Sequence, residues 1–496
     1  MTSRRRAALV ACAVGGLVVA GLAAWWLASS GDDGSAPADT SAADAAEATT
    51  TTTALVGQPG SPGLGDPYFP GLGNGGYDVQ HYTLALTWQP DAGSIAGSTT
   101  IEATATQDLS RFNLDLVGLE VSSVVVDGSA AATARSGREL EVAPRTAIPS
   151  GASFTVTVAY SGVPTPVSEG TELFDVGWQT DGREAYVVSE PSGAATFFPA
   201  NDHPSDKATY RFEITAPADQ VVAASGVLTA QRDEPDGTKV WTYEARDPMA
   251  SYLAQLAIGD FVLVDREPFG NVRIRHALHR SFSDSAADVA SRTAEMIDVL
   301  DDVFGPFPFE VYGVVAVDEP LGFALETQTL TIIGSDIARA GRRADRVMVH
   351  ELAHQWVGNT VSPATWKDIW LNEGFATYSE WLWAERTGGV SAAASARDAA
   401  GIRADLDIPP GDPGSGELFE TSVYVRGAMT LQALREAIGD DAFFTVLRQW
   451  VDENRDASAA TADFIALAER VSGQQLDDLF LAWLYGPSLP RLAPRS

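Results

Sequence analysis

The sequence predicts a multidomain α+β fold, in which an antiparallel β domain is followed by a mostly helical α/β domain. Up to about residue 265, apolar residues alternate with polar ones, as in strands with one buried face. Helical periodicity appears beyond that point and dominates from about residue 346. The 496 residues exceed one ordinary domain, and a hydrophobic content of 45% is enough to build buried cores.

Residues 1–30 are predicted to be a signal anchor or a signal peptide. Arginines at positions 4 to 6 precede 22 uncharged residues, Ala7 to Ala28, a length that can span a bilayer with its basic end in the cytoplasm. An anchor is favoured because cleaved signals usually have shorter apolar cores, although small residues follow this one. A lipoprotein site at Cys12 is disfavoured, because only five apolar residues precede it. We expect the protein at the extracytoplasmic face of the cell membrane, or secreted if residues 1–30 are cleaved.

Residues 31–66 are rich in Ala, Thr, Gly, Pro and Ser and are predicted to be a flexible linker. Residues 67–265 are predicted to form a β-sandwich or a saddle-shaped β domain, because period-two runs alternate with Gly, Asp and Pro turns. The apolar faces of four such runs are Tyr82, Leu84, Leu86 and Trp88; Phe112, Leu114 and Leu116; Phe154, Val156 and Val158; and Tyr210, Phe212 and Ile214.

Residues 266–496 are predicted to form the helical domain. A helix is predicted over residues 283–305, with Asp284 as its N-cap. Two short apolar runs, at 311–317 and 329–334, are predicted strands, and helical patterns continue toward the C-terminus. The apolar stripe of the first helix consists of Val289, Met296, Leu300 and Val303.

The formal net charge of −33 repels phosphate backbones, which argues against a nucleic-acid partner. Such a charge usually serves a soluble surface, and it also attracts cationic substrates. The single cysteine, Cys12, excludes an intrachain disulfide and a thiolate metal site. Any metal must therefore be held by His, Asp or Glu.

The stretch VMVHELAHQWVGN fits the metal-binding pattern H-E-x-x-H at His350, Glu351 and His354. Residues four apart lie on one face of a helix, so the two imidazoles can bind one Zn²⁺ while Glu351 acts on water. The chain has only six histidines, so a chance match is rare. The alternative is a helix with structural His and Glu side chains.

A hydrolytic zinc site needs a third protein ligand and an open coordination position. Glu373 follows His354 after 18 intervening residues, which lets a second helix pack back and present one carboxylate. Spacing alone leaves open that Glu373 lies on a solvated helix face, because acidic residues are dense in this region.

The pattern H-E-x-x-H followed by the glutamate of NEGFA is that of the gluzincin peptidases. HELAHQWVGN with WLNEGFATY resembles the M1 group, which includes aminopeptidase N and leukotriene A4 hydrolase. The resemblance covers residues 68–490 and implies a thermolysin-like catalytic domain after the β domain. It implies a zinc metallo-aminopeptidase with one Zn²⁺ per chain, held by His350, His354 and Glu373, and with Glu351 as general base.

Three further segments are similar to the family. In FALET, Glu326 corresponds to a glutamate that binds the substrate's α-amino group, and Ala324 lies in the same substrate-binding motif. SEPSGAATFFPANDHPSDKATY carries Glu190 at the position of the second amine-binding residue, and in YVRGA, Tyr424 corresponds to the phenol that stabilises the oxyanion. The resemblance thus implies peptide substrates with a free N-terminus. Without it, these would be ordinary loop, edge-strand and core residues.

The sequence departs from the family pattern at three positions. Phe323 replaces a glycine and Thr327 replaces an asparagine of the substrate-binding motif, which leaves the preferred N-terminal residue open. Arg426 replaces a lysine and keeps its charge. The chain also ends at Ser496, soon after the catalytic pattern, so the large helical C-terminal domain of long members is expected to be absent.

Two other functions stay open from the sequence. A zinc endopeptidase would use the same metal ligands without binding an N-terminus. A catalytically inactive surface binding protein would be marked by a broken ligand set, yet the zinc motif has all four of its residues: His350, Glu351, His354 and Glu373.

Overall fold

The computed structural model describes residues 55–168, 175–402 and 406–492. The predicted signal segment, residues 1–30, lies outside these ranges. None of the helices within them combines the length and the apolar character that a membrane crossing requires.

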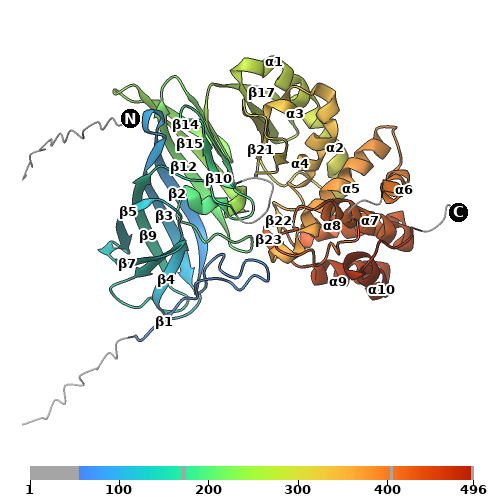
Figure 1. Cartoon of the computed structure of the whole chain (residues 1–496), viewed down its shortest axis with the longest axis horizontal. Helices are drawn as coiled ribbons and strands as arrows, with labels where there is room; N and C mark the ends of the chain where they lie inside the picture. The colour runs from blue at the N-terminus through green and yellow to red at the C-terminus, as the bar shows by residue number, and fades with distance from the viewer. Residues whose placement is uncertain (1–54, 169–174, 403–405, 493–496) are drawn as a thin grey trace, which may run out of the picture. The chain divides into compact units, whose positions relative to one another are not determined.

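In the described part of the chain, the N-terminal half forms three β-sheets (Figure 1). The largest has the strand order β14-β15-β12-β2-β3-β9-β5-β6, and the two smaller ones have the orders β1-β4-β8-β7 and β10-β11-β16-β13. The bounds are β1 Gln58–Pro59, β2 Tyr77–Gln89, β3 Ser94–Ala105, β4 Leu109–Asp115, β5 Glu120–Val126, β6 Ser129–Ala130, β7 Ala132–Ser136, β8 Glu139–Ala143, β9 Ser153–Gly162, β10 Gly177–Thr180, β11 Ala185–Val188, β12 Lys207–Pro217, β13 Val221–Ala224, β14 Val227–Asp233, β15 Thr238–Ala250 and β16 Leu256–Gly259.

The alternation predicted for this half is confirmed. The apolar residues expected on one face of β2, β4, β9 and β12 are buried, and β2 and β12 place more exposed residues between them. Most neighbouring strands are antiparallel, as predicted. β12 and β2 run parallel instead, because β12 enters the sheet after a long connection from β11 and not through a hairpin.

The folded part begins before residue 67, inside the predicted linker. The Gln58 N–H donates to the Asp108 carbonyl at 2.7 Å, and β1 pairs with β4. The buried Asp66 carboxylate accepts the backbone N–H groups of Tyr68 and Trp366, both at 2.8 Å. Composition misses this order because backbone hydrogen bonds can fix a Gly- and Pro-rich segment that has no apolar repeat.

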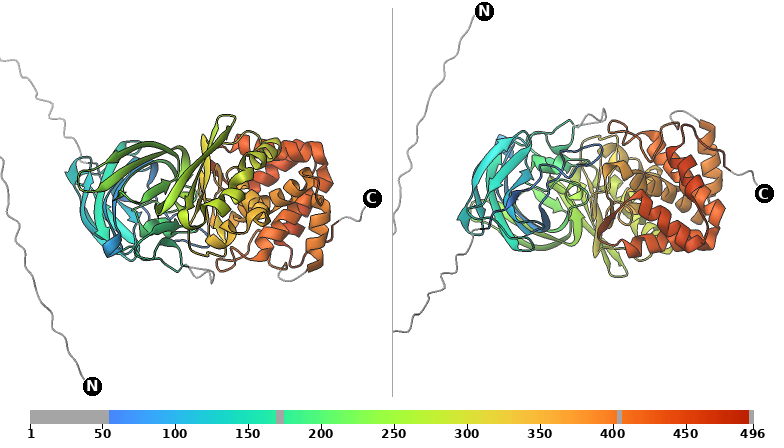
Figure 2. Two further views of the ribbon diagram at one scale, coloured as in Figure 1. Left: turned by 90° about the horizontal axis from the view of Figure 1, so that it is seen from above. Right: turned by 90° about the horizontal axis from the view of Figure 1, so that it is seen from below.

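The C-terminal half combines a β-sheet with helices, so the predicted two-domain α+β architecture is confirmed. The sheet has the order β17-β18-β19-β21-β20, with β18–β19 and β19–β21 parallel, and Figure 2 shows it beside the helices in both views. The bounds are β17 Phe261–Phe269, β18 Val272–His279, β19 Val311–Ala316, β20 Ala324–Leu325, β21 Leu330–Ile333, β22 Val361–Pro363, β23 Ala457–Ala459, α1 Ser283–Val289, α2 Thr293–Phe304, α3 Ser335–Ala338, α4 Asp345–Ala353, α5 Trp370–Arg386, α6 Ala392–Ile402, α7 Thr421–Ile438, α8 Asp440–Glu453, α9 Thr461–Ser472 and α10 Asp477–Phe480.

Two details differ from the expected boundaries. The boundary predicted at residue 265 falls inside β17, which pairs with β18, so the change of sheet lies between β16 and β17. The helix predicted over residues 283–305 is divided into α1 and α2 by a 3₁₀ turn at Ala290–Arg292. Asp284 lies in the first turn of α1 and is not an N-cap, because the helix begins one residue earlier.

The sheet β10-β11-β16-β13 packs on the sheet β17-β18-β19-β21-β20 of the C-terminal half. One apolar cluster joins β11, β13 and β16 to β18, β19 and β21, and its buried members include Val188, Ala257, Val315 and Ile332. Burying apolar surface stabilises such a contact by about 25 cal/mol per Å². The two domains are therefore joined by a core and not only by a linker.

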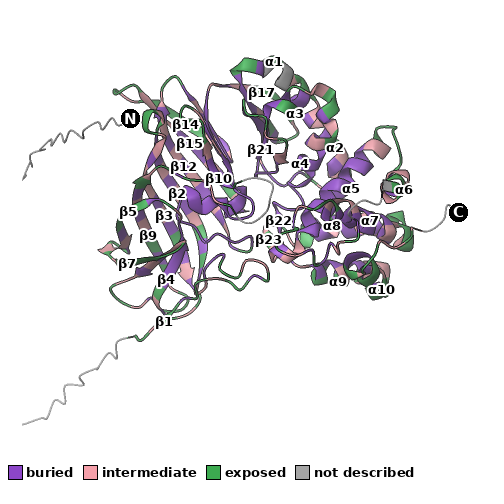
Figure 3. Ribbon diagram, in the orientation of Figure 1, coloured by how far each residue is buried: buried purple, intermediate pink, exposed green. Residues whose placement is uncertain are grey.

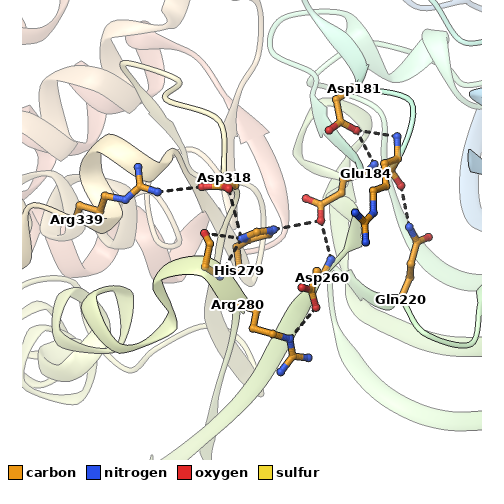
Figure 4. Close-up of polar contacts among 10 residues, drawn as sticks. Asp181, Glu184, Gln220, Asp260, His279, Arg280, Asp318 and Arg339 are labelled. Carbon is orange, nitrogen blue, oxygen red and sulfur yellow. Dashed lines mark hydrogen bonds and ion pairs between the residues drawn. The ribbon is translucent and has the colours of Figure 1, made fainter.

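A polar network fixes the β10–β11 hairpin beside this core (Figure 4). Glu184 Oε1 accepts the Asp260 N–H at 2.9 Å and lies 3.2 Å from His279 Nε2. Asp318 lies 3.8 Å from the other ring nitrogen of His279 and pairs with Arg339 at 3.0 Å. Because β11 follows Glu184 directly, the network also holds the strand that leads to Glu190.

Candidate active site

Helix α4 carries the H-E-x-x-H motif. His350 and Glu351 lie in its last turn, and His354 follows directly, with its N–H bonded to the His350 carbonyl at 3.4 Å. The two imidazole rings are therefore one turn apart on one face, with centroids 4.9 Å apart.

Helix α5 brings Glu373 to both histidines. Glu373 Oε2 lies 3.2 Å from His350 Nε2 and 3.6 Å from His354 Nε2. Glu373 is 3% exposed, and α5 is buried from Trp370 to Trp383 (Figure 3). Glu373 therefore does not lie on a solvated helix face.

The outer nitrogen of each imidazole has a partner of its own. His350 Nδ1 lies 2.9 Å from Glu380 Oε1, and His354 Nδ1 lies 3.2 Å from the Val357 carbonyl. Both partners are acceptors, so each Nδ1 donates to its partner and each Nε2 faces Glu373, where a metal would bind. Histidines that bind a metal are usually oriented in this way.

The three side chains fit a zinc ion. Their ligand atoms lie within 4.8 Å of one another, and zinc at its usual bond lengths of about 2.1 Å would place tetrahedral ligand atoms about 3.4 Å apart. Two imidazoles and one carboxylate are also a donor set of catalytic zinc sites, with a fourth position left for water or substrate.

A close crossing of α5 and α7 brings Tyr424 to the same site. A Cβ on Gly374 would meet the Gly427 backbone at 2.9 Å, so only glycine allows this approach. Gly374 follows Glu373, and Gly427 lies about one turn after Tyr424. The Tyr424 ring stacks on His350 with centroids 5.8 Å apart. Burial raises the pKa of Tyr424 well above its ordinary value, so the phenol keeps its proton.

Glu326 and Glu190 approach the site from two different elements. Glu326 directly follows β20, and its carbonyl accepts the side-chain amides of Gln355 at 2.9 Å and Asn359 at 2.7 Å. Glu190 lies two residues after β11, in the β domain. Ligand atoms of Glu190, Glu326 and Glu373 lie within 4.8 Å of one another. The structure thus brings both predicted amine-binding residues next to the predicted metal ligands.

Burial dominates the electrostatics of these carboxyl groups. It raises the pKa of Glu351 to about 8, although the two imidazoles oppose the shift. Burial also raises the pKa of Glu190, and the neighbouring Glu326 adds to the effect. Burial would raise the pKa of Glu373 as well, but the imidazoles lower it to about 2. The site gathers more acidic than basic groups, and its chemistry favours a cation.

A cavity of about 520 Å³ connects these groups. Glu351, Tyr424 and Ala324 all line it, together with the three predicted metal ligands, Glu190 and Glu326. All eight residues predicted for the site therefore face one cavity. Its size suits a short peptide or an amino acid with part of its neighbour.

Two domain families match the chain. The Peptidase M1 N-terminal domain matches residues 78–253, and the Peptidase family M1 domain matches residues 289–483. The chain belongs to peptidase family M1. The family expected from HELAHQWVGN and NEGFATY is thus confirmed.

A solved M1 member is similar over most of its length. The M1 zinc metallopeptidase of Deinococcus radiodurans is 35% identical, with a TM-score of 0.81, and the match covers 87% of this chain and 98% of that chain. Aminopeptidase M1 of Arabidopsis thaliana is 25% identical over 60% of this chain and 36% of its own length. Probable aminopeptidase 2 of Sulfurisphaera tokodaii is 27% identical over 76% of this chain and 50% of its own length. The chain spans half or less of these two relatives.

The departures from the M1 pattern have different consequences. Phe323 lines the cavity, so its side chain narrows the site. Thr327 turns away from it, because its hydroxyl donates to the Leu330 carbonyl and accepts from Gln255. Arg426 is fully buried away from the cavity and donates only to backbone carbonyls.

Sequence reasoning missed the residues that position this M1 site. Glu380 lies two helical turns after Glu373 on the same face of α5, which is a signal that could have found it. Gln355 and Asn359 stand inside the quoted stretch HELAHQWVGN. Nothing in the sequence indicates that their side-chain amides donate to the carbonyl of Glu326, because that contact depends on how the end of α4 packs against the segment after β20.

Proposed function

We propose that this chain is a zinc-dependent aminopeptidase that hydrolyses the N-terminal peptide bond of peptides. The observation that carries the proposal is the pair Glu190 and Glu326. Both are buried, and one carboxylate oxygen of each has no hydrogen-bond partner in the described part of the chain. Buried carboxylates need a partner, and the α-ammonium of a peptide offers positive charge and three N–H donors.

Zinc is the metal that suits His350, His354 and Glu373, and the Deinococcus radiodurans relative is itself named a zinc metallopeptidase. When bound, zinc supplies a Lewis acid that polarises a carbonyl and makes water a nucleophile near neutral pH. One ion per chain is expected, because the three ligand groups meet at one point.

Glu351 is the proposed general base. Its carboxylate lies beside the metal ligands, in a group with Glu326 and His354 whose ligand atoms are within 4.8 Å of one another. From there it can take a proton from the attacking water and pass it to the departing amine. The protonated Tyr424 hydroxyl, which lines the same cavity, would donate a hydrogen bond to the carbonyl oxygen as negative charge develops.

The two alternative functions explain less of this site. A zinc endopeptidase would leave Glu190 and Glu326 buried without a cation. An inactive binding protein would need neither Glu351 nor the oriented imidazoles. A mutant of the Deinococcus radiodurans protein was solved with a Tyr-Ser-Ala substrate, which supports a peptide as the substrate class here.

Acetylation of the substrate tests the proposal together with metal removal. The zinc-loaded protein should hydrolyse a panel of amino-acid anilides and short peptides. A chelator should abolish this activity, and added Zn²⁺ should restore it. N-acetylated peptides should react at least about 30-fold more slowly, because removing one partner of a buried charge pair costs about 2 to 5 kcal/mol. Equal cleavage of acetylated peptides would establish an endopeptidase. Zinc binding without hydrolysis of the panel would establish a binding protein.

We further propose that the protein acts outside the cytoplasm, on the strength of the uncharged residues 7–28. Retention at the membrane is favoured over secretion by the length of that segment. Mass spectrometry of protein from membrane and culture fractions distinguishes an intact N-terminus from a cleaved one. A cytoplasmic protein with residues 1–30 intact would contradict both forms of the proposal.

A further inference from the structure

A second cavity adjoins the catalytic one. It has a volume of about 810 Å³ and lies among α4, α5, α6 and α7. Arg346 and Glu380 line both cavities and form an ion pair, so the two cavities adjoin at this pair. Because Arg342, Arg343 and Arg346 line one wall, we call it the arginine groove.

Three arginines and three acidic residues line the groove, in a chain whose formal net charge is −33. Two of its acidic residues are compensated, since Asp345 pairs with Arg292 and Glu380 pairs with Arg346. Arg342 and Arg343 are exposed and form no ion pair with any described residue. Asp398, on α6, forms no ion pair with a described residue. Arg292 is the main group that lowers the pKa of Glu295, and Arg342 is close enough to add to this effect. Neither Arg342 nor Arg343 has a direct ion-pair partner among the described residues, so both guanidinium groups can bind an anion in the groove.

We propose that the arginine groove binds the part of the substrate that follows the cleaved bond, and that Arg342 and Arg343 hold its C-terminal carboxylate. This proposal rests on the aminopeptidase function proposed above. Guanidinium groups match carboxylates in shape as well as in charge, because they donate two parallel N–H groups. Trp381 and Trp383 line the same groove and offer apolar surface to the intervening side chains.

Distances along α5 set the length of peptide that would fit. Glu380 follows Glu373 by seven residues and lies about 10 Å further along the helix, and Trp383 lies about 15 Å further. An extended peptide advances about 3.4 Å per residue. Arg342 and Arg343 lie in the 3₁₀ turn Gly341–Ala344 that leads into α4, about 10 to 12 Å before His350 along that helix. A carboxylate three to four residues after the cleaved bond would therefore reach these arginines, so the preferred substrates are tetrapeptides and pentapeptides with both termini free.

Comparing free acids with amides tests the proposal. The kcat/KM of the zinc-loaded protein is measured for peptides of two to eight residues, each as the C-terminal acid and as the C-terminal amide. We expect the acid to be preferred by about fivefold to tenfold at four and five residues, as for two exposed charge pairs of up to about 1 kcal/mol each. The double variant Arg342→Gln, Arg343→Gln should lose this preference. Amino-acid anilides have no C-terminal carboxylate, so the double variant should hydrolyse them with the same kcat/KM as the unaltered protein.

The control variant is Arg448→Gln, Arg470→Gln, which removes the same charge from exposed positions on α8 and α9 and should keep the preference. Equilibrium binding of the same peptides to Glu351→Gln gives a second readout that does not depend on turnover. Equal values for acids and amides at every length would overturn the proposal. So would a preference that survives in the Arg342, Arg343 variant. If the unaltered zinc-loaded protein does not hydrolyse anilides at all, that result would instead refute the proposed function itself.

Discussion

Replacing Glu351 by glutamine or alanine is expected to lower kcat for amino-acid anilides by about 10³-fold, while one zinc ion per chain stays bound. Glutamine keeps the volume of the buried side chain but cannot accept a proton from water. The metal should remain, because the proposed ligands are His350, His354 and Glu373, whose donor atoms converge without Glu351. Initial rates and metal analysis of the purified variants give the two quantities.

Glu373→Gln is the matched control. It also removes one carboxylate charge from the cavity, but Glu373 is a proposed zinc ligand. It should lose zinc as well as activity, since a neutral amide is a poor zinc ligand. A Glu351 variant that keeps more than a tenth of the activity would contradict its assignment as the base. If a Glu351 variant loses its zinc, Glu351 would be a zinc ligand and not the base.

Short-range patterns in the sequence predicted the features that depend on neighbouring residues. Alternation in β2 and β12 follows from one buried face, and the pairing of His350 with His354 follows from helical geometry. The prediction for Glu373 required only that a second helix pack against the first, and the buried helix α5 does so. These are local consequences of periodicity, so a single sequence is enough to find them.

Features that depend on long-range approach could not be predicted from periodicity. Glu190 and Glu326 are 136 residues apart in the chain and meet because two sheets pack through Val188 and Ile332. The contact of Gly374 with Gly427 sets where Tyr424 lies, yet a glycine in a helix pattern is ordinarily interpreted as a weak point. Only the resemblance to family M1 placed these residues in one site.

Arg426 is the clearest case of a residue whose role the sequence hid, because keeping the charge of the family's lysine suggested only a conservative change. Its guanidinium is fully buried and donates to the backbone carbonyls of Trp483, Leu406, Asp407, Ala482 and Gly486. It thereby ties α7 to the segment between α6 and α7 and to the segment after α10. Burial lowers its pKa, but five carbonyl dipoles surround the charge.

Arg426→Met is therefore expected to lower the free energy of unfolding by about 3 to 5 kcal/mol, because each buried carbonyl left without a donor costs about 1 to 3 kcal/mol and removal of the charge offsets part of that. Arg426→Lys should be intermediate, since an ammonium has three donors for these five acceptors. Denaturant unfolding followed by tryptophan fluorescence measures both. Arg448→Met, at an exposed position on α8, is the control and should change stability by less than about 0.5 kcal/mol. If Arg426→Met unfolds at the same denaturant concentration as the unaltered protein, the carbonyl cluster does not hold the C-terminal segment in place.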